Sequence, residues 1–385
     1  MTGVLRNPKL TAVKVEPFLL ERFFAAHEFS VRRLLCASDC ETLSLGELLA
    51  LEPGAEEAFS ALRLGYSETA GSPGLRREIA SLYDGIDADD VLVFSGAEEA
   101  IFVFMNAVLA AGDGIVVHSP CYQSLASVAA AAGCRVTRWT AAAEQGWALD
   151  ADDLIALAGP GTRAVAVNFP HNPTGYLPER GRFVAITEFA RRRGLILFSD
   201  EVYRFLEYDP ADRLPAACEL YEKGVSLGVM SKSFGLAGLR LGWVACRDRG
   251  ILRAMAAMKD YTTICAAAPS EFLAGVALRR REAFLGRCLG TVRANLELLD
   301  RFLARHSDRF SWVRPKAGPV AFPALRSAGT CDDFCSRLLR EQGVLLAPGR
   351  LFQADPARFR IGFGRADFSE GLDELDRFIE GKNLG

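Results

Sequence analysis

One lysine stands where an amine can become reactive. Lys232 follows an apolar run and precedes a glycine-rich loop in VMSKSFGLAGLRLGW, residues 229–243. An amine in such a place is partly desolvated, which lowers its pKa and frees it to form a Schiff base. Only seven of the 45 basic residues are lysines, and an arginine cannot act as an amine nucleophile. The alternative interpretation is that Lys232 is a solvated loop lysine without a chemical role. The neighbouring motifs are needed to choose between the two interpretations.

A carboxylate and a phenol occur together in SDEVY, residues 199–203. Asp200 ends an apolar run and could pair with the protonated ring nitrogen of a cofactor. Tyr203 lies three residues further on and could hydrogen-bond the same ligand. The alternative is a helix-capping aspartate followed by a packed tyrosine.

Two further segments carry groups suited to a phosphorylated ligand. In NFPHNPTG, residues 168–175, two prolines fix the backbone so that the Asn172 amide can be aimed at a ligand oxygen. In SGAEEAIF, residues 95–102, the backbone amides of Gly96, Ala97 and Glu98 would open a helix and could cradle a phosphate. Arg240 lies eight residues after Lys232 and could add a bidentate phosphate contact.

The elements that must position these residues indicate an α/β fold. Seven β-like runs recur at 91–94, 115–118, 135–139, 163–168, 195–199, 225–231 and 242–246, with helix-compatible stretches between the earlier ones. This alternation predicts a seven-stranded, mostly parallel sheet flanked by helices, with one strand antiparallel. Ligands bind at the carboxyl ends of the strands in such sheets. After residue 248 the pattern becomes helical, with a break near Pro269, and then mixed.

We therefore expect a large α/β domain and a smaller α+β domain formed by both chain ends. The expected boundaries are an N-terminal segment at 1–54, a large cofactor-binding domain at 55–275 and a small domain at 276–385. The net charge of −3 and the lack of a basic excess argue against nucleic-acid binding. Ten scattered cysteines, four histidines and no leader-like or membrane-length apolar segment predict a cytoplasmic protein with buried thiols and without a metal site.

In their order and spacing, NPTG, SDEVY and SKSFGLAGLRLGW resemble the fold-type I enzymes that use pyridoxal 5′-phosphate, specifically the class I/II aminotransferases. The resemblance extends over roughly residues 30–370. It implies that Lys232 binds the cofactor covalently and moves the α-proton, while Asp200 holds the pyridine nitrogen protonated. It also implies that Asn172 and Tyr203 bond the phenolic oxygen of the ring.

The same resemblance assigns the remaining contacts. Tyr122 is expected to stack on the ring, and Arg360 to clamp the substrate α-carboxylate together with Asn172. Tyr66 is expected to reach the phosphate of a neighbouring subunit, which implies a homodimer. The phosphate-binding set is Gly96, Ala97, Glu98, Ser231 and Arg240.

Two departures from the family pattern stand out. Val229 occupies a position that often carries a phosphate-binding serine, so Ser95 or Ser231 would have to compensate. The N-terminal loop reads CASDCETLSLGEL, residues 36–48, and places Asp39 and Glu41 near the substrate entrance. These carboxylates suggest recognition of a basic amino acid, although a solvated acidic turn would look the same. Segment 261–270 offers no arginine for a side-chain carboxylate, so a dicarboxylic substrate is disfavoured.

The predicted activity is an exchange of amino groups between an amino acid and a 2-oxo acid. The alternative keeps the cofactor but changes the reaction, as in lyases, oxidases or cyclases acting on amino acids such as arginine in biosynthetic pathways. A ligand-sensing regulator is a third possibility. About 30 residues precede the matching region, which is too few for a DNA-binding module.

Overall fold

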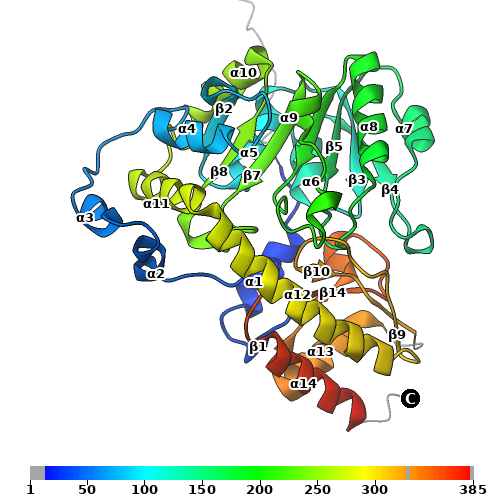
Figure 1. The fold of residues 1–385 in the computed structure, drawn as a ribbon. Coiled ribbons are helices and arrows are strands. Elements are labelled where there is room, and N and C mark those ends of the chain that lie inside the picture. The colour runs from blue at the N-terminus through cyan, green and yellow to red at the C-terminus, as the bar shows by residue number, and fades with distance from the viewer. Residues whose placement is uncertain (1–13, 327–329, 382–385) are drawn as a thin grey trace, which may run out of the picture.

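A computed structural model of the chain describes residues 14–326 and 330–381. Its main body is a seven-stranded sheet covered by helices (Figure 1). The strand order is β2-β8-β7-β6-β5-β3-β4. The strands are β2 (Val91–Phe94), β3 (Gly114–Ser119), β4 (Arg135–Thr140), β5 (Thr162–Asn168), β6 (Ile196–Asp200), β7 (Gly224–Val229) and β8 (Gly242–Ala245). Only β8 runs antiparallel to its neighbours in this sheet, which confirms the predicted mostly parallel arrangement.

Both faces of the sheet are buried because successive strand side chains point to opposite sides. On one face, Val117 and Phe198 pack against α5 (Ala97–Ala107), α6 (Ser124–Ala131) and α10 (Arg249–Lys259). On the other face, Val116 and Leu197 pack against α7 (Ala151–Leu157) and α8 (Arg180–Arg193). At the β2 edge, Val93 packs against α4 (Pro73–Ala80) and α11 (Ala268–Arg279).

The stretch after residue 248 contains three helices rather than one helix with a single break. They are α10, α11 and α12 (Arg281–Arg305). Pro269 lies in the first turn of α11, where its missing N–H removes no intrahelical bond. The proline therefore marks a helix start, and the chain breaks at residues 260–267 and again at Arg280.

A smaller α+β unit lies below the sheet in Figure 1, and α12 runs into it from the sheet body. Its strands are β1 (Arg33–Leu34), β9 (Phe310–Ser311), β10 (Val320–Ala321), β11 (Ala324–Leu325), β12 (Val344–Leu345), β13 (Ala347–Pro348) and β14 (Phe359–Gly362). Its helices besides α12 are α13 (Cys331–Gln342) and α14 (Phe368–Glu380). The parallel pairing of β1 with β12 joins the two ends of the chain, as the predicted fold class requires.

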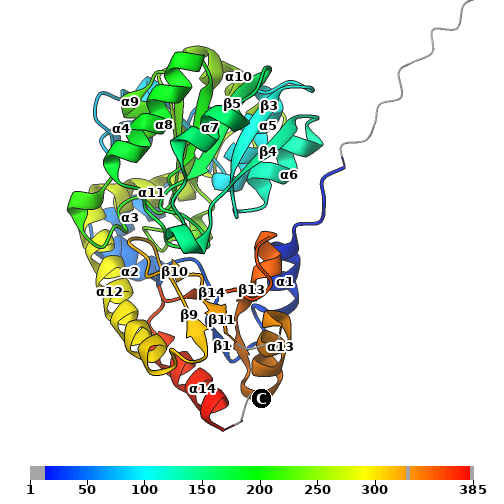
Figure 2. The same ribbon diagram turned by 90° about the vertical axis from the view of Figure 1, so that its right-hand side faces the viewer.

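The remaining N-terminal helices link these parts. They are α1 (Leu19–His27), α2 (Leu45–Ala50) and α3 (Ala55–Ser60). Figure 2 shows α1 beside the short turn at Gly349–Phe352 of the small unit. Two hydrogen bonds with Gln123 tie the entrance of α1 to the sheet body: the Leu19 N–H donates to Oε1, and Nε2 donates to the Pro17 carbonyl. This anchoring brings the N-terminal helix to the carboxyl edge of the sheet.

None of the helices within 14–326 and 330–381 has the length and apolar character of a membrane span. All ten cysteines are free thiols, and nine of them are buried, as expected for packed apolar side chains.

Candidate active site

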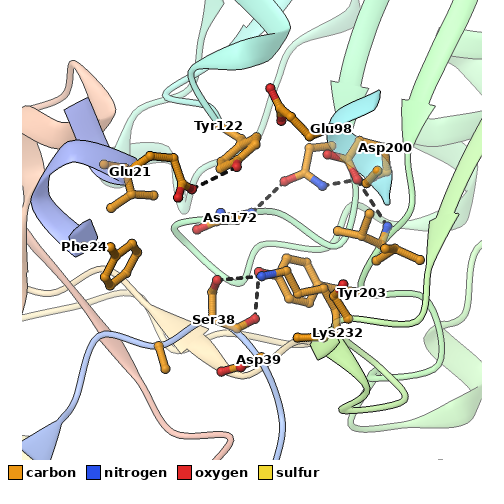
Figure 3. A pocket seen from close by; sticks show the side chains of 18 of the residues that line it. Glu21, Phe24, Ser38, Asp39, Glu98, Tyr122, Asn172, Asp200, Tyr203 and Lys232 are labelled. Carbon is orange, nitrogen blue, oxygen red and sulfur yellow. Dashed lines mark hydrogen bonds between the residues drawn. The ribbon is translucent and has the colours of Figure 1, made fainter. Parts of the chain in front are cut away.

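A cavity of about 550 Å³ lies between the carboxyl ends of the strands and the small unit (Figure 3). Most of the residues singled out in the sequence line it, together with groups from α1 and from the loop after β1. The lining residues used below are Glu21, Phe24, Glu28, Ser38, Asp39, Ala97, Glu98, Tyr122, Asn172, Asp200, Tyr203, Val229, Ser231, Lys232, Arg240 and Arg365.

Lys232 follows β7 and projects its amine into this cavity. Its Nζ donates to Ser38 Oγ at 2.9 Å, so the amine of the sheet body contacts the N-terminal loop of the small unit. Burial lowers the pKa of Lys232, while the charge of Asp39 opposes that effect. The side chain therefore has the lowered basicity that an amine nucleophile or a proton-transfer base needs.

Asp200 ends β6 and is almost completely buried. Burial raises its pKa to about 7, although a hydrogen bond from the Val202 N–H and the charge of Lys232 oppose this. Among residues 14–326 and 330–381, no cation forms an ion pair with this carboxyl, and Lys232 acts on it only through its charge. A protonated ring nitrogen would supply an ion-pair partner and would hold Asp200 ionised.

The loop after β5 is fixed by its own amide side chains. Asn168 Oδ1 accepts from the Asn172 N–H at 2.8 Å, and Asn168 Nδ2 donates to the Asp200 carbonyl at 2.9 Å. The Asn172 amide is therefore held at the end of neighbouring strands β5 and β6, as the proline-rich motif predicts.

The two tyrosines lie on different walls of the cavity. Tyr203 is buried, and its hydroxyl donates to the Ser38 carbonyl at 3.0 Å. Tyr122 packs against Phe18 with ring centres 4.9 Å apart, and its hydroxyl donates to Glu21 Oε1 at 3.1 Å. Burial is the main cause that raises the pKa of both phenols, so both are hydrogen-bond donors at neutral pH.

The turn from β2 into α5 lies beside the Arg240 guanidinium. Gly96 has φ +94°, and a Cβ at this position would lie 2.9 Å from Arg240 Nη2. Ala97 and Glu98 follow at the start of α5 and line the cavity. The absence of a side chain at Gly96 thus leaves room for the guanidinium beside the free amides of the helix. This geometry suits a phosphate.

Val229 occupies a position that often carries a phosphate-binding serine, and the cavity lining shows which nearby serine could replace it. Val229 and Ser231 both line the cavity. The Ser95 N–H, in contrast, donates to Glu99 Oε2, and Ser95 is not among the lining residues. Of the two serines considered, Ser231 lines the cavity and Ser95 does not.

Arg360 comes from β14 and is completely buried behind the cavity wall. Its Nε and Nη2 donate to the Cys36 carbonyl, and its Nη1 donates to Asn172 Oδ1 at 3.0 Å. These bonds use three of the five guanidinium N–H groups, which leaves one on each terminal nitrogen for a carboxylate.

The structure does not bring every expected residue to the cavity with a free side chain. Asp39 lines it, but both carboxylate oxygens are engaged by Arg365 at 3.0 and 3.2 Å. Glu41 is not among the lining residues, and its Oε2 accepts from the Ala366 N–H at 2.8 Å. Tyr66 is 90% exposed, away from the lining of this cavity.

Sequence reasoning missed the contribution of α1. Glu21, Phe24 and Glu28 all line the cavity and follow one another at helical spacings of three and four residues. That spacing was the available signal, but nothing local showed which surface the helix would face. Ser38 was missed for the same reason.

The donor set fits pyridoxal 5′-phosphate. A desolvated amine, a buried carboxyl and an amide cradle kept open by Gly96 surround one cavity. Lys232, Asp200, Asn172 and Tyr203 would hold the ring, and the start of α5 with Arg240 would hold the phosphate.

Comparisons with known proteins agree with this geometry. The family model for aminotransferase class I and II matches residues 35–375. Capreomycidine synthase of Streptomyces vinaceus is 32% identical over the full length of both chains. Arginine–pyruvate transaminase AruH of Pseudomonas aeruginosa is 30% identical over 77% of each chain.

Solved structures give the same result. A PLP-dependent aminotransferase from Streptococcus suis is 29% identical, with a TM-score of 0.91 over 97% of this chain and 100% of the other. The PLP-dependent cyclase OrfR is 32% identical, with a TM-score of 0.88 over 98% of this chain and 100% of the other. The chain therefore belongs to the class I and II aminotransferase family and is an enzyme that uses pyridoxal 5′-phosphate.

Proposed function

We propose that this enzyme exchanges the amino group of a basic amino acid with a 2-oxo acid. The observation that carries the proposal is that Lys232 and Asn172 line the same cavity, and that the buried Arg360 donates to Asn172 Oδ1 from behind that wall. Together they provide an α-carboxylate site and a base for the α-proton. The family fixes the cofactor, and the arginine–pyruvate transaminase relative supports a basic substrate.

Each residue would have a role that follows from its position in the cavity. Arg360 and Asn172 would bind and orient the substrate α-carboxylate, so that the α-carbon faces Lys232. Bound pyridoxal phosphate supplies the electron sink for the α-carbon. Lys232 would remove the α-proton and return it at the cofactor side, and Asp200 would stabilise positive charge at the ring nitrogen. Tyr122 would cover one side of the ring and exclude water from it.

A second candidate is cyclisation or elimination on a basic amino acid. It is favoured by the relatives that match over the whole length, because these include capreomycidine synthase and a PLP-dependent cyclase. Cofactor-binding residues do not distinguish the two reactions, since both begin with loss of the α-proton.

A product analysis separates them. The holoenzyme is incubated with L-arginine, a hydroxylated arginine and several neutral amino acids, with and without pyruvate. Alanine formed in equal amount to a 2-oxo acid supports transamination. Ammonia or a cyclic product formed without pyruvate supports the second candidate.

We also propose a cytoplasmic homodimer. Three large side chains are strongly exposed on segments next to the cofactor-binding body: Leu64 is 81%, Tyr66 90% and Tyr261 87% exposed. Exposed side chains of this size favour contact with a second copy, which would also bring Tyr66 toward a neighbouring phosphate.

A further inference from the structure

The charges that line the cavity do not balance once the cofactor and the α-carboxylate are assigned. Arg240 would bind the phosphate of the cofactor, and Asp200 would pair with its ring nitrogen. Lys232 would form the covalent bond to the cofactor. Arg360 is reserved for the substrate carboxylate. Asp39 is paired with Arg365. Besides Glu98 at the start of α5, two further carboxylates then remain in the lining: Glu21 of α1 and Glu28, which caps the end of that helix.

Neither of these carboxylates has a cationic partner in the part of the chain that the structure describes. Glu21 accepts only the neutral hydroxyl of Tyr122, at 3.1 Å. The nearby cation Arg365 is held by both oxygens of Asp39. Burial raises the pKa of Glu28, and the charges of Asp39 and Glu21 add to this while Arg365 opposes it. A cation on a bound ligand would stabilise the charged form of these two carboxylates.

The position of Glu21 and Glu28 relative to the α-carboxylate site indicates that the cation belongs to the side chain of the substrate. Arg360 Cζ lies 5.8 Å from the ring centre of Phe24, so a substrate held by Arg360 begins close to α1. Figure 3 shows Glu21 and Phe24 across the cavity from Asp200. A substrate whose carboxylate is held by Arg360 would therefore have the α1 wall within reach of its side chain.

The face of α1 suits a positively charged end group. Glu21, Phe24 and Glu28 are separated by three and four residues and share one face of the helix. An aromatic ring between two carboxylates offers charge pairing and a flat surface for a guanidinium or ammonium group. The cavity is a ligand site on independent grounds, namely the buried Lys232 amine and the Asp200 carboxyl that line it. The two carboxylates are therefore placed to affect which substrate binds there.

We propose that Glu21 of α1 and Glu28, the residue that caps its end, bind the distal cation of the substrate side chain and determine the preference for a basic amino acid. This inference rests on the proposed function. It moves the role first considered for Asp39 and Glu41 to a different element, because Asp39 is already paired with Arg365 and Glu41 is not among the residues that line the cavity.

The test uses the holoenzyme and two pairs of near-isosteric ligands. L-Arginine is compared with neutral L-citrulline, and L-lysine with L-norleucine, by titrating the change in visible absorbance of the bound cofactor. Glu21→Gln and Glu28→Gln are measured beside Glu16→Gln, an exposed residue of the same segment that is not in the cavity lining. Glutamine at position 21 still accepts the Tyr122 hydroxyl, so the cofactor wall is retained.

We expect Glu21→Gln and Glu28→Gln to weaken binding of the basic ligand about ten-fold or more, the effect of losing a charged hydrogen bond. Binding of the neutral partner should change less than about two-fold, and Glu16→Gln should behave like the unaltered enzyme. If both cavity variants keep the original preference for the basic ligand, the assignment to α1 is wrong. If the unaltered enzyme itself shows no preference for the basic ligands, the basic substrate of the proposed function is wrong instead.

Discussion

Lys232 Nζ lies 2.9 Å from Ser38 Oγ, and the carbonyl of the same serine accepts the Tyr203 hydroxyl at 3.0 Å. Ser38 therefore joins the amine after β7 to the phenol after β6 through one residue of the N-terminal loop. The contact holds the small unit against the sheet body at the reacting amine. It also gives the ammonium form of Lys232 an acceptor that a bound substrate would have to displace.

Replacing Ser38 by alanine should lower the pKa of the Lys232 amine further. A hydrogen bond to a charged group contributes about 1.5–3 kcal/mol, and one pKa unit corresponds to about 1.36 kcal/mol, so a shift of about one to two pH units is expected. The pH profile for cofactor capture by the apoenzyme, followed by visible absorbance, should move to lower pH by that amount. Ser30→Ala is the control because Ser30 bonds only the His27 carbonyl. An unmoved profile for Ser38→Ala would show that this contact does not tune the amine.

Lys232→Ala should remove the covalent bond to the cofactor and the base together. We expect the absorbance of lysine-bound cofactor to vanish and kcat to fall by about 10³-fold or more, as for loss of a general base that is also a covalent anchor. Lys223→Ala removes a lysine outside the cavity lining and should leave both signals intact. Retained absorbance in Lys232→Ala would mean that another amine holds the cofactor.

The sequence allowed the sheet and the cofactor side of the site to be predicted because those residues lie at strand ends. Asn172, Asp200 and Lys232 each follow a parallel strand, so strand order alone brings them to one edge. The substrate side could not be predicted in this way. Ser38 and Glu21 reach the cavity only because β1 pairs with β12 and α1 docks through Gln123, contacts between residues about 100 to 300 positions apart. No local pattern encodes such docking.

Arg360→Lys should separate recognition of the substrate carboxylate from the chemistry. Lysine keeps the charge but loses the planar fork that bonds Cys36 and Asn172 on one side and a carboxylate on the other. We expect KM for the amino acid to rise about 100-fold. Binding of agmatine, which lacks the carboxylate of arginine, should change little. Arg350→Lys, on an exposed arginine paired with Asp332, serves as the control. Equal losses for arginine and agmatine would remove Arg360 from the carboxylate site.

Leu64→Asp should convert the proposed dimer into monomers. A charge on this exposed apolar side chain would be costly to bury against a second copy. We expect the mass measured by light scattering to halve and cofactor binding to weaken, because Tyr66 of a neighbour could no longer reach the phosphate. Ile155→Asp places the same charge on an exposed side chain of α7 and should leave the mass unchanged. An unaltered protein that is monomeric at micromolar concentration would refute the dimer.

Asp200→Asn should make the stability of the apoenzyme less dependent on pH. The same substitution should weaken the binding of the cofactor. Burial raises the folded-state pKa of Asp200 to about 7 from its ordinary value of 3.8. The folded apoenzyme therefore holds a proton that the unfolded chain has lost, and its stability declines as the pH rises from about 4 to 7. Asparagine removes this decline, which is on the order of a few kcal/mol at pH 8. The Tm difference between pH 5 and pH 8 should accordingly shrink in the apo variant. Cofactor affinity should fall at both pH values, because the ring nitrogen loses its carboxylate. A Tm difference equal to that of the unaltered apoenzyme would show that Asp200 is already ionised without cofactor.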